Sequence, residues 1–221
     1  MPKENPVYRT ARVLATLTIK PLFRLRIEGA EHVPAEGPVL IASNHLSTLD
    51  PIVLAYGVPR PVAFVAKAEL FRMPVLSWLI PRLYAIPLER GAGDLSAVKA
   101  AIRALHAGLA FGIFPEGTRS RTGKLQPFKT GAAAIAARTG ALVVPAAVIG
   151  SDRAWPVGKG PRPFTPVTVR YGEPLDFSGL KLDKKSLQEA TRALEEAVAR
   201  LLPPEYLPEE SFAPPKQPEG R

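Results

Sequence analysis

Short apolar runs alternate with helix-like stretches along most of the chain. The apolar runs predict strands at residues 39–43, 62–66, 85–88, 112–114, 142–149 and 167–171. Helical spacing of apolar residues predicts helices at residues 50–56, 74–83, 94–107, 131–138 and 184–202. Such alternation is typical of parallel strands joined by crossover helices. The pattern therefore predicts an α/β fold, a single layered domain with a largely parallel central sheet flanked by helices.

The two ends of the chain differ from this pattern. Residues 7–23 predict a basic amphipathic helix that ends near Pro21. Such a helix can lie in a membrane interface or pack its apolar side on the domain. Residues 203–221 hold six prolines and four glutamates, a composition typical of chain without a fixed fold. We therefore predict an N-terminal amphipathic helix (1–24), one folded domain (25–202) and a proline-rich disordered tail (203–221).

The charge of the chain narrows its range of partners. Its 221 residues carry a formal net charge of +9, with a sequence pI near 10. This favours nucleic acid, an anionic membrane surface, the phosphates of coenzyme A or an acidic carrier protein. Aromatic residues make up only 7% of the chain and no recognised nucleic-acid motif is present, so we predict no nucleic-acid partner. No run of 18 apolar residues occurs, so we predict no transmembrane helix.

The content of cysteine and histidine restricts the chemistry. The chain has no cysteine, which excludes disulfides and thiolate metal ligands and fits a reducing compartment. Its three histidines, His32, His45 and His106, do not share a metal-ligand spacing, and we predict neither a metal site nor a cofactor. The absence of cysteine and of G-x-S-x-G also removes a thiol or serine-elbow nucleophile.

His45 and Asp50 form the first candidate site. They lie five residues apart, directly after the apolar run at 39–43. Imidazole accepts a proton near neutral pH, and a nearby carboxylate can fix its tautomer. Ligands of open α/β sheets bind beyond the carboxyl ends of strands, where this loop is expected. The pair therefore indicates a base that activates a substrate hydroxyl. A purely structural alternative remains, because Asp50 before Pro51 is typical of a helix N-cap.

A second polar segment, residues 114–121, also follows a predicted strand. Gly117 permits a sharp turn, and the guanidinium of Arg119 suits a phosphate or carboxylate. Glu116 can hold a hydroxyl or orient an arginine. The alternative is a polar turn with a surface ion pair.

Basic residues recur after other predicted strands. Lys67 follows residues 62–66, and Arg90 follows residues 85–88. Lys129 precedes a predicted helix start, where backbone N–H groups also favour an anion. Each is by itself compatible with a solvated surface charge. Their recurrence predicts an anion-binding site at the carboxyl edge of the sheet.

Four sequence blocks together resemble the 1-acylglycerol-3-phosphate acyltransferase family of the glycerolipid acyltransferase superfamily. NHLSTLD (44–50) resembles the NHxSxxD block of that family, and FPEGTRS (114–120) resembles its glycerolipid block. PLERG (87–91) and VVPAAVIG (143–150) resemble its arginine block and its last block. All four occur in the order of the family. The resemblance implies that residues 25–202 form an acyltransferase domain.

The resemblance also implies a reaction in phospholipid biosynthesis. A fatty acyl group would pass from acyl-CoA or acyl-carrier protein to the sn-2 hydroxyl of lysophosphatidate, giving phosphatidate. His45 would be the base and Asp50 its partner. The implied substrate-binding residues are Glu116, Gly117, Arg119, Lys67 and Arg90. A lipid acceptor further implies a peripheral or monotopic protein on the anionic, cytoplasmic face of the cell membrane.

Other functions remain open from the sequence. The same blocks can serve another acceptor, such as glycerol 3-phosphate, another lysophospholipid or a lyso-amino-lipid. The charge alone would also suit a nucleic-acid-binding domain. A hydrolase of phosphate esters or thioesters is a third alternative, although no metal set or protein nucleophile favours it.

Overall fold

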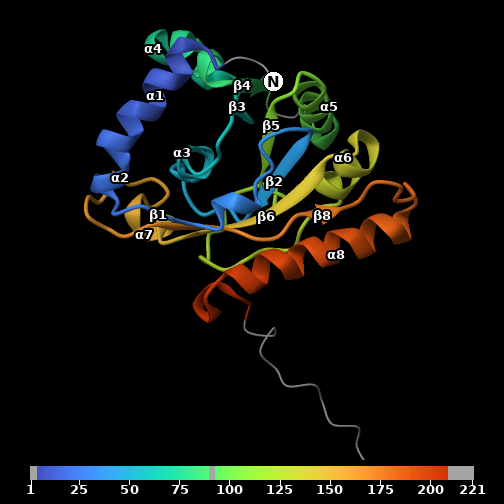
Figure 1. Ribbon diagram of the computed structural model, residues 1–221. Helices are drawn as coiled ribbons and strands as arrows, with labels where there is room; N and C mark the ends of the chain where they lie inside the picture. Colours follow the sequence, from blue (N-terminus) through green and yellow to red (C-terminus); the bar gives the residue numbers. More distant parts are fainter. Residues whose placement is uncertain (1–3, 90–92, 209–221) are drawn as a thin grey trace, which may run out of the picture.

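A central sheet organises the computed structural model, which describes residues 4–89 and 93–208 (Figure 1). Its strands are β1 (Arg26–Glu28), β2 (Val39–Ser43), β3 (Val62–Lys67), β4 (Ala85–Leu88), β5 (Ala110–Ile113), β6 (Leu142–Ile149), β7 (Thr168–Tyr171) and β8 (Leu175–Asp176). In the described part of the chain their order is β1-β7-β6-β2-β5-β3-β4, and β8 pairs with β6. Most pairs are parallel; only β7 and β8 run antiparallel to β6. The predicted largely parallel α/β sheet is confirmed.

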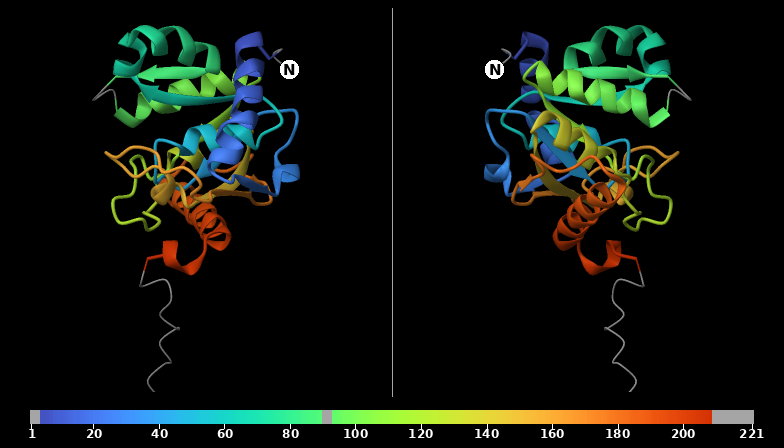
Figure 2. Two further views of the ribbon diagram at one scale, coloured as in Figure 1. Left: turned by 90° about the vertical axis from the view of Figure 1, so that its left-hand side faces the viewer. Right: turned by 90° about the vertical axis from the view of Figure 1, so that its right-hand side faces the viewer.

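Helices cover both faces of this sheet (Figures 1 and 2). They are α1 (Pro6–Leu17), α2 (Ile19–Leu22), α3 (Asp50–Tyr56), α4 (Pro74–Leu79), α5 (Gly93–His106), α6 (Gly131–Thr139), α7 (Ser151–Ala154) and α8 (Lys184–Leu201). Short 3-10 turns are η1 (Ala30–His32), η2 (Ala68–Arg72), η3 (Ile80–Leu83) and η4 (Pro204–Tyr206). Residues of α5, α6 and α8 pack on one face, and residues of α3 pack on the other.

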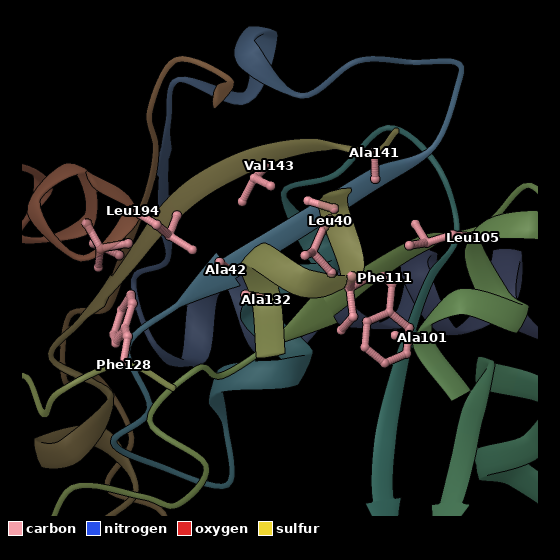
Figure 3. Packing of buried hydrophobic residues seen from close by; sticks show 14 of the residues in the cluster. Leu40, Ala42, Ala101, Leu105, Phe111, Phe128, Ala132, Ala141, Val143 and Leu194 are labelled. Atoms are coloured by element: carbon pink, nitrogen blue, oxygen red, sulfur yellow. The ribbon is translucent and has the colours of Figure 1, made fainter. Parts of the chain in front are cut away.

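Strand β2 lies in the middle of the sheet, and its five residues are all buried. Successive side chains of a strand point to opposite faces. Leu40 therefore packs with Phe111 and Leu194 in one apolar cluster, whereas Val39 and Ile41 join the other. Figure 3 shows the first cluster, which lies between the sheet and its helices. This double burial fixes the register of β2, so the loop that follows it starts from a rigid position.

The predicted N-terminal helix is broken into two. Helix α1 ends at Leu17, and Thr18 N–H donates to the carbonyl of Leu14 as α2 begins. Pro21 explains the break, because a proline ring clashes with the carbonyl four residues earlier, here that of Leu17. Tyr8 anchors α1 in the protein and is 4% exposed. Among the described helices, none has the length and hydrophobicity needed to cross a bilayer.

The C-terminal segment is ordered further than expected. The sequence predicted a disordered tail from residue 203, yet η4 forms there and Tyr206 is buried. The Tyr206 hydroxyl accepts a hydrogen bond from Gly150 N–H (3.0 Å) and donates one to Asp152 (3.1 Å). The proline-rich composition of the segment does not predict that Tyr206 anchors it to the domain. The remaining part of the predicted tail, residues 209–221, lies outside the described residues.

Candidate active site

His45 and Asp50 contact each other in the loop between β2 and α3. The Nδ1 atom of His45 lies 2.8 Å from Oδ2 of Asp50. The same oxygen accepts the backbone N–H groups of Leu46 (2.6 Å) and Ser47 (2.7 Å). Asp50 is fully buried. An ionised carboxylate can only accept, so Nδ1 carries the proton and Nε2 of His45 is left as the basic nitrogen.

Asp50 does not cap helix α3. The N-cap of α3 is Leu49, and Asp50 is the first helical residue. Its carboxylate turns back to hold the loop that carries His45, instead of capping the helix as Asp50-Pro51 suggested. Ser47 reinforces the loop, because its hydroxyl donates to the Trp155 carbonyl (2.6 Å) and accepts from Leu49 N–H (3.2 Å).

Asn44 fixes the start of the same loop. Its side-chain oxygen accepts from Val148 N–H (2.8 Å), and its amide donates to the Val148 carbonyl (2.9 Å). The Asn44 side chain thus makes the two hydrogen bonds to the Val148 backbone of β6 that a further residue of β2 would otherwise make. Sequence analysis does not predict this role of Asn44. A polar amide directly after a buried strand was the available signal, since a buried amide requires partners.

The segment that follows β5 also contacts His45. Glu116 Oε1 accepts the backbone N–H of His45 (2.9 Å), and Ser120 N–H donates to the His45 carbonyl (2.8 Å). The ring of Phe114 stacks on the imidazole, with centroids 3.9 Å apart and planes inclined by 15°. Backbone and ring of His45 are therefore both restrained. Sequence analysis missed the contribution of Phe114, because an aromatic at a strand end also fits the core.

Glu116 has an environment unlike that of a surface carboxylate. It is 5% exposed, and its Oε2 atom is buried without a hydrogen-bond partner among the described residues. Burial raises the pKa of Glu116 to about 8, against the lowering effect of the His45 N–H. Glu116 is thus largely protonated near neutral pH. It lies behind the His45 loop and is absent from the residues that line the neighbouring cavity.

A cavity of about 710 Å³ opens beside His45. Among the described residues, the basic side chains that line it are those of Lys67, Arg119 and Lys129. Its apolar lining includes Phe64, Val65, Leu88 and Ile113. A polar head with an apolar chain suits such a mixed wall, because cations attract anions and buried apolar surface is favourable. Arg119 also donates to the Thr48 hydroxyl (2.9 Å) and so contacts the His45 loop directly.

Gly117 makes the turn that brings Arg119 to the cavity. Its φ of +76° lies in the left-handed region, where glycine is unstrained. A Cβ atom there would also lie 3.0 Å from Cε and Nζ of Lys129. The turn that the sequence predicts at Gly117 is present.

Most of the predicted site residues lie together at the carboxyl ends of neighbouring strands. His45, Gly117, Arg119 and Lys67 all line the cavity, and they follow or end β2, β5 and β3. Arg90 lies outside the described residues. Within the described part of the chain, no group of three or more metal-binding side chains is placed to hold an ion.

Comparisons with known proteins point in one direction. Residues 24–149 match the protein family described as acyltransferase. A 1-acyl-sn-glycerol-3-phosphate acyltransferase of Bacillus subtilis is 32% identical over 181 residues, which are 80% of this chain and 87% of that protein. A chloroplastic enzyme of the same name from Arabidopsis thaliana is 34% identical over 151 residues, or 67% of this chain. The match spans only 42% of the plant protein, less than half of its length.

Solved structures of similar fold include that of a similarly named enzyme. It is the crystal structure of PlsC, the 1-acyl-sn-glycerophosphate acyltransferase of Thermotoga maritima. The TM-score is 0.68 and the sequence identity is 31%, and the match covers 88% of this chain and 78% of that one.

Proposed function

The chain belongs to the acyltransferase family, and from this premise we propose that it transfers a fatty acyl group from acyl-CoA or acyl-carrier protein to the sn-2 hydroxyl of lysophosphatidate, giving phosphatidate. The observation that carries the proposal is the 2.8 Å contact between His45 and Asp50 beside a cavity lined by Lys67 and Arg119. The names of the relatives support lysophosphatidate as the acceptor.

In the proposed reaction His45 Nε2 removes the proton of the acceptor hydroxyl. The oxygen attacks the thioester carbonyl, and the tetrahedral intermediate expels the thiolate while the new ester bond forms. The proton on His45 then passes to the departing thiolate, so the base is regenerated. Asp50 keeps the imidazole oriented and stabilises its charged form, as a buried carboxylate does in hydrolytic triads. Neither a metal nor a covalent acyl-enzyme enters this sequence of steps.

We assign Glu116 a positioning role in this scheme. The family resemblance implied that it binds the acceptor, and that prediction has not been tested. Its burial and its bond to the His45 N–H favour support of the base instead. Gly117, Arg119 and Lys67 keep the predicted contact with the acceptor, since they line the cavity, and we add Lys129 to them.

Arg119→Ala is expected to weaken acceptor binding. A hydrogen bond between two charged groups contributes roughly 1.5–3 kcal/mol, so KM for lysophosphatidate should rise about 10- to 100-fold. Steady-state kinetics over a range of lysophosphatidate concentrations at fixed oleoyl-CoA measure this effect.

Two matched variants separate phosphate binding from other effects of Arg119→Ala. Arg121→Ala removes the same charge two residues away, where the side chain does not line the cavity. Thr48→Val removes the bond between Arg119 and the His45 loop without removing the charge. Both should keep a KM close to wild type. An unchanged KM in Arg119→Ala, or an equal rise in Arg121→Ala, would refute the phosphate contact.

Acyl transfer itself is tested with labelled oleoyl-CoA and a panel of acceptors. Labelled phosphatidate from lysophosphatidate is the expected product. Preferred turnover of glycerol 3-phosphate or of a lysolipid without a phosphate monoester would change the acceptor and keep the enzyme class. Release of free fatty acid in place of a diacyl lipid would identify a thioesterase. Replacing oleoyl-CoA by oleoyl-carrier protein identifies the donor.

We extend the proposal to a peripheral position on the anionic, cytoplasmic face of the membrane. Its support is α1, where Tyr8 is anchored in the protein while Val13, Leu14 and Leu17 are exposed. Three exposed apolar side chains on one helix, together with Arg9, suit a membrane interface.

The triple change of Val13, Leu14 and Leu17 to serine is expected to weaken binding to anionic vesicles. Removal of three partly inserted side chains should lower partitioning by at least about tenfold, since a fully buried side chain of this size contributes about 1.5–3 kcal/mol. Vesicle co-sedimentation measures the bound fraction. Leu182→Ser, at an exposed leucine near α8, is the control and should bind like wild type. Equal sedimentation of all three proteins would show that α1 is not an anchor.

A further inference from the structure

The connection between β3 and β4 carries several exposed apolar side chains. Leu70 in η2 and Met73, Val75 and Trp78 in and beside α4 all reach solvent, with Val75 exposed by 74% and Trp78 by 55%. We call these four residues the β3–β4 apolar patch. Helix α4 has only six residues and none of them is buried. Contiguous exposed apolar residues of this kind mark interaction surfaces more often than chance exposure.

The connection that carries the patch contacts the start of the N-terminal helix. The Asn5 amide donates to the Arg82 carbonyl (2.8 Å), and the rings of Tyr8 and Tyr84 meet edge to face with centroids 5.3 Å apart. Both contacts tie α1 to the end of η3, which directly follows α4. Figures 1 and 2 show the start of α1 beside α4, whereas the rest of α1 runs away toward α2. The two contacts therefore hold the start of α1 against the connection that carries the patch.

Basic residues accompany these apolar side chains. Residues 4–22 contain three basic residues and Glu4, which pairs with Arg12, and residues 68–89 contain Glu69, Arg72, Arg82 and Glu89. The net charge of the two segments is therefore 2 + 0 = +2. The Arg82 guanidinium lies 4.5 Å from the ring centre of Trp78. Tryptophan beside a cation is favoured at the membrane–water boundary, where the ring meets lipid and the charge stays in water. This charge complements an anionic lipid surface.

The connection that carries the β3–β4 apolar patch starts and ends at the cavity, although the four patch residues do not line it. Lys67 lines the cavity, and η2 begins with the next residue. Arg72 Nη2 lies 3.7 Å from Oε1 of Glu89, and Glu89 lines the cavity as well. A surface that rests on lipid here would bring the wall of the cavity to the membrane.

We propose that the β3–β4 apolar patch is a second membrane contact, which inserts into the interface of an anionic bilayer beside α1 and turns the cavity toward the leaflet. This proposal rests on the proposed lipid acceptor. A lipid that remains partly in the bilayer would then enter the cavity without crossing water.

Trp78 provides a direct probe of insertion. The chain has two tryptophans, so Trp155→Phe leaves Trp78 as the only indole. Anionic vesicles of phosphatidylglycerol and phosphatidylcholine should shift its emission to the blue, and brominated acyl chains should quench it. An emission that stays unchanged while the protein sediments with the vesicles would overturn the proposal. Concentration-dependent dimerisation that shifts the emission without lipid would instead assign the patch to a second copy of the chain.

A double variant tests the contact in the otherwise unchanged chain. Val75→Ser with Trp78→Ser is expected to lower vesicle partitioning by about tenfold or more. Val157→Ser with Leu182→Ser removes two exposed side chains elsewhere and should partition like wild type. Equal partitioning of the two double variants would contradict a membrane role for the patch.

Activity measured in two substrate forms separates this proposal from the proposed function. With a short-chain lysophosphatidate dissolved as monomers, Val75→Ser with Trp78→Ser should turn over at the wild-type rate. With a long-chain acceptor in vesicles its rate should fall together with its partitioning. Loss in both forms would mean that the patch serves catalysis or folding and not membrane contact. Absence of acyl transfer by the wild type would refute the proposed function, while vesicle binding would still decide the role of the patch.

Discussion

His45→Ala is expected to lower kcat for acyl transfer by about 10²- to 10⁴-fold, the range contributed by a positioned general base. The reason is geometric, because Asp50 occupies Nδ1 of His45 and leaves Nε2 as the basic nitrogen beside the cavity. Alanine removes that nitrogen and leaves the backbone contacts to Glu116 and Ser120 in place. Folding should therefore survive. Product formation from labelled oleoyl-CoA and lysophosphatidate measures the rate, and thermal unfolding checks the fold.

His106→Ala is the matched control. It removes an imidazole from the exposed side of α5, and its rate should equal that of wild type. A His45→Ala protein that is folded and transfers acyl groups at more than about a tenth of the wild-type rate would exclude general-base catalysis by His45. The proposed mechanism would then have no base.

Glu116 is expected to make stability fall as pH rises. Its pKa is about 8 in the folded protein, against 4.5 for an ordinary glutamate. Below pH 4.5 both the folded and the unfolded states hold the proton. Between pH 4.5 and 8 the unfolded chain releases it while the folded protein keeps it, so the free energy of unfolding decreases with pH. Above pH 8 both states are ionised and the decrease ends.

Glu116→Gln is expected to remove this pH dependence. Wild type should lose on the order of 4 kcal/mol from this group between pH 4.5 and 8, and the glutamine variant should not. Glutamine resembles the protonated acid and can still accept the His45 N–H, so turnover at pH 7 should persist. Glu116→Ala removes that acceptor and should reduce kcat.

Urea unfolding at several pH values measures the difference between the two proteins. All other titrating groups are common to both, so they cancel in the comparison. Glu189→Gln, on the exposed surface of α8, changes the same functional group in solvent and should leave the pH profile unchanged. Parallel profiles for wild type and Glu116→Gln would mean that Glu116 is ionised in the folded protein at neutral pH.

Sequence analysis located three strands at their observed limits, and two of these, β2 and β6, are buried on both faces, while the third is β4 at the edge of the sheet. Residues 39–43 and 142–149 are almost continuous apolar runs. Burial on both sides leaves no polar position to interrupt the run. Strand β1 was missed because its three residues, Arg26–Glu28, are half exposed at the edge of the sheet.

The sequence predicted which residues lie at the cavity better than it predicted what each of them does there. His45, Gly117, Arg119 and Lys67 were placed at strand ends, and a parallel sheet brings such ends together. The role proposed for Glu116 could not be derived from the sequence. Whether a carboxylate faces substrate or supports a neighbouring loop depends on contacts between segments 71 residues apart. The same limit applied to Asp50, whose side chain turns away from the cap position that its sequence context favours.

Two hydrogen bonds attach the backbone of His45 to the segment after β5, so a change of acceptor through this segment would also affect the base. Glu116 and Ser120 bind the backbone of His45, and Arg119 between them reaches the cavity. An insertion or a new turn in this segment would move the base together with the acceptor contact. Lys67 and Leu88 line the cavity from β3 and β4, on the far side of β5 from the His45 loop. New acceptors are therefore better sought through substitutions in β3 and β4, where the wall can change while the base stays in place.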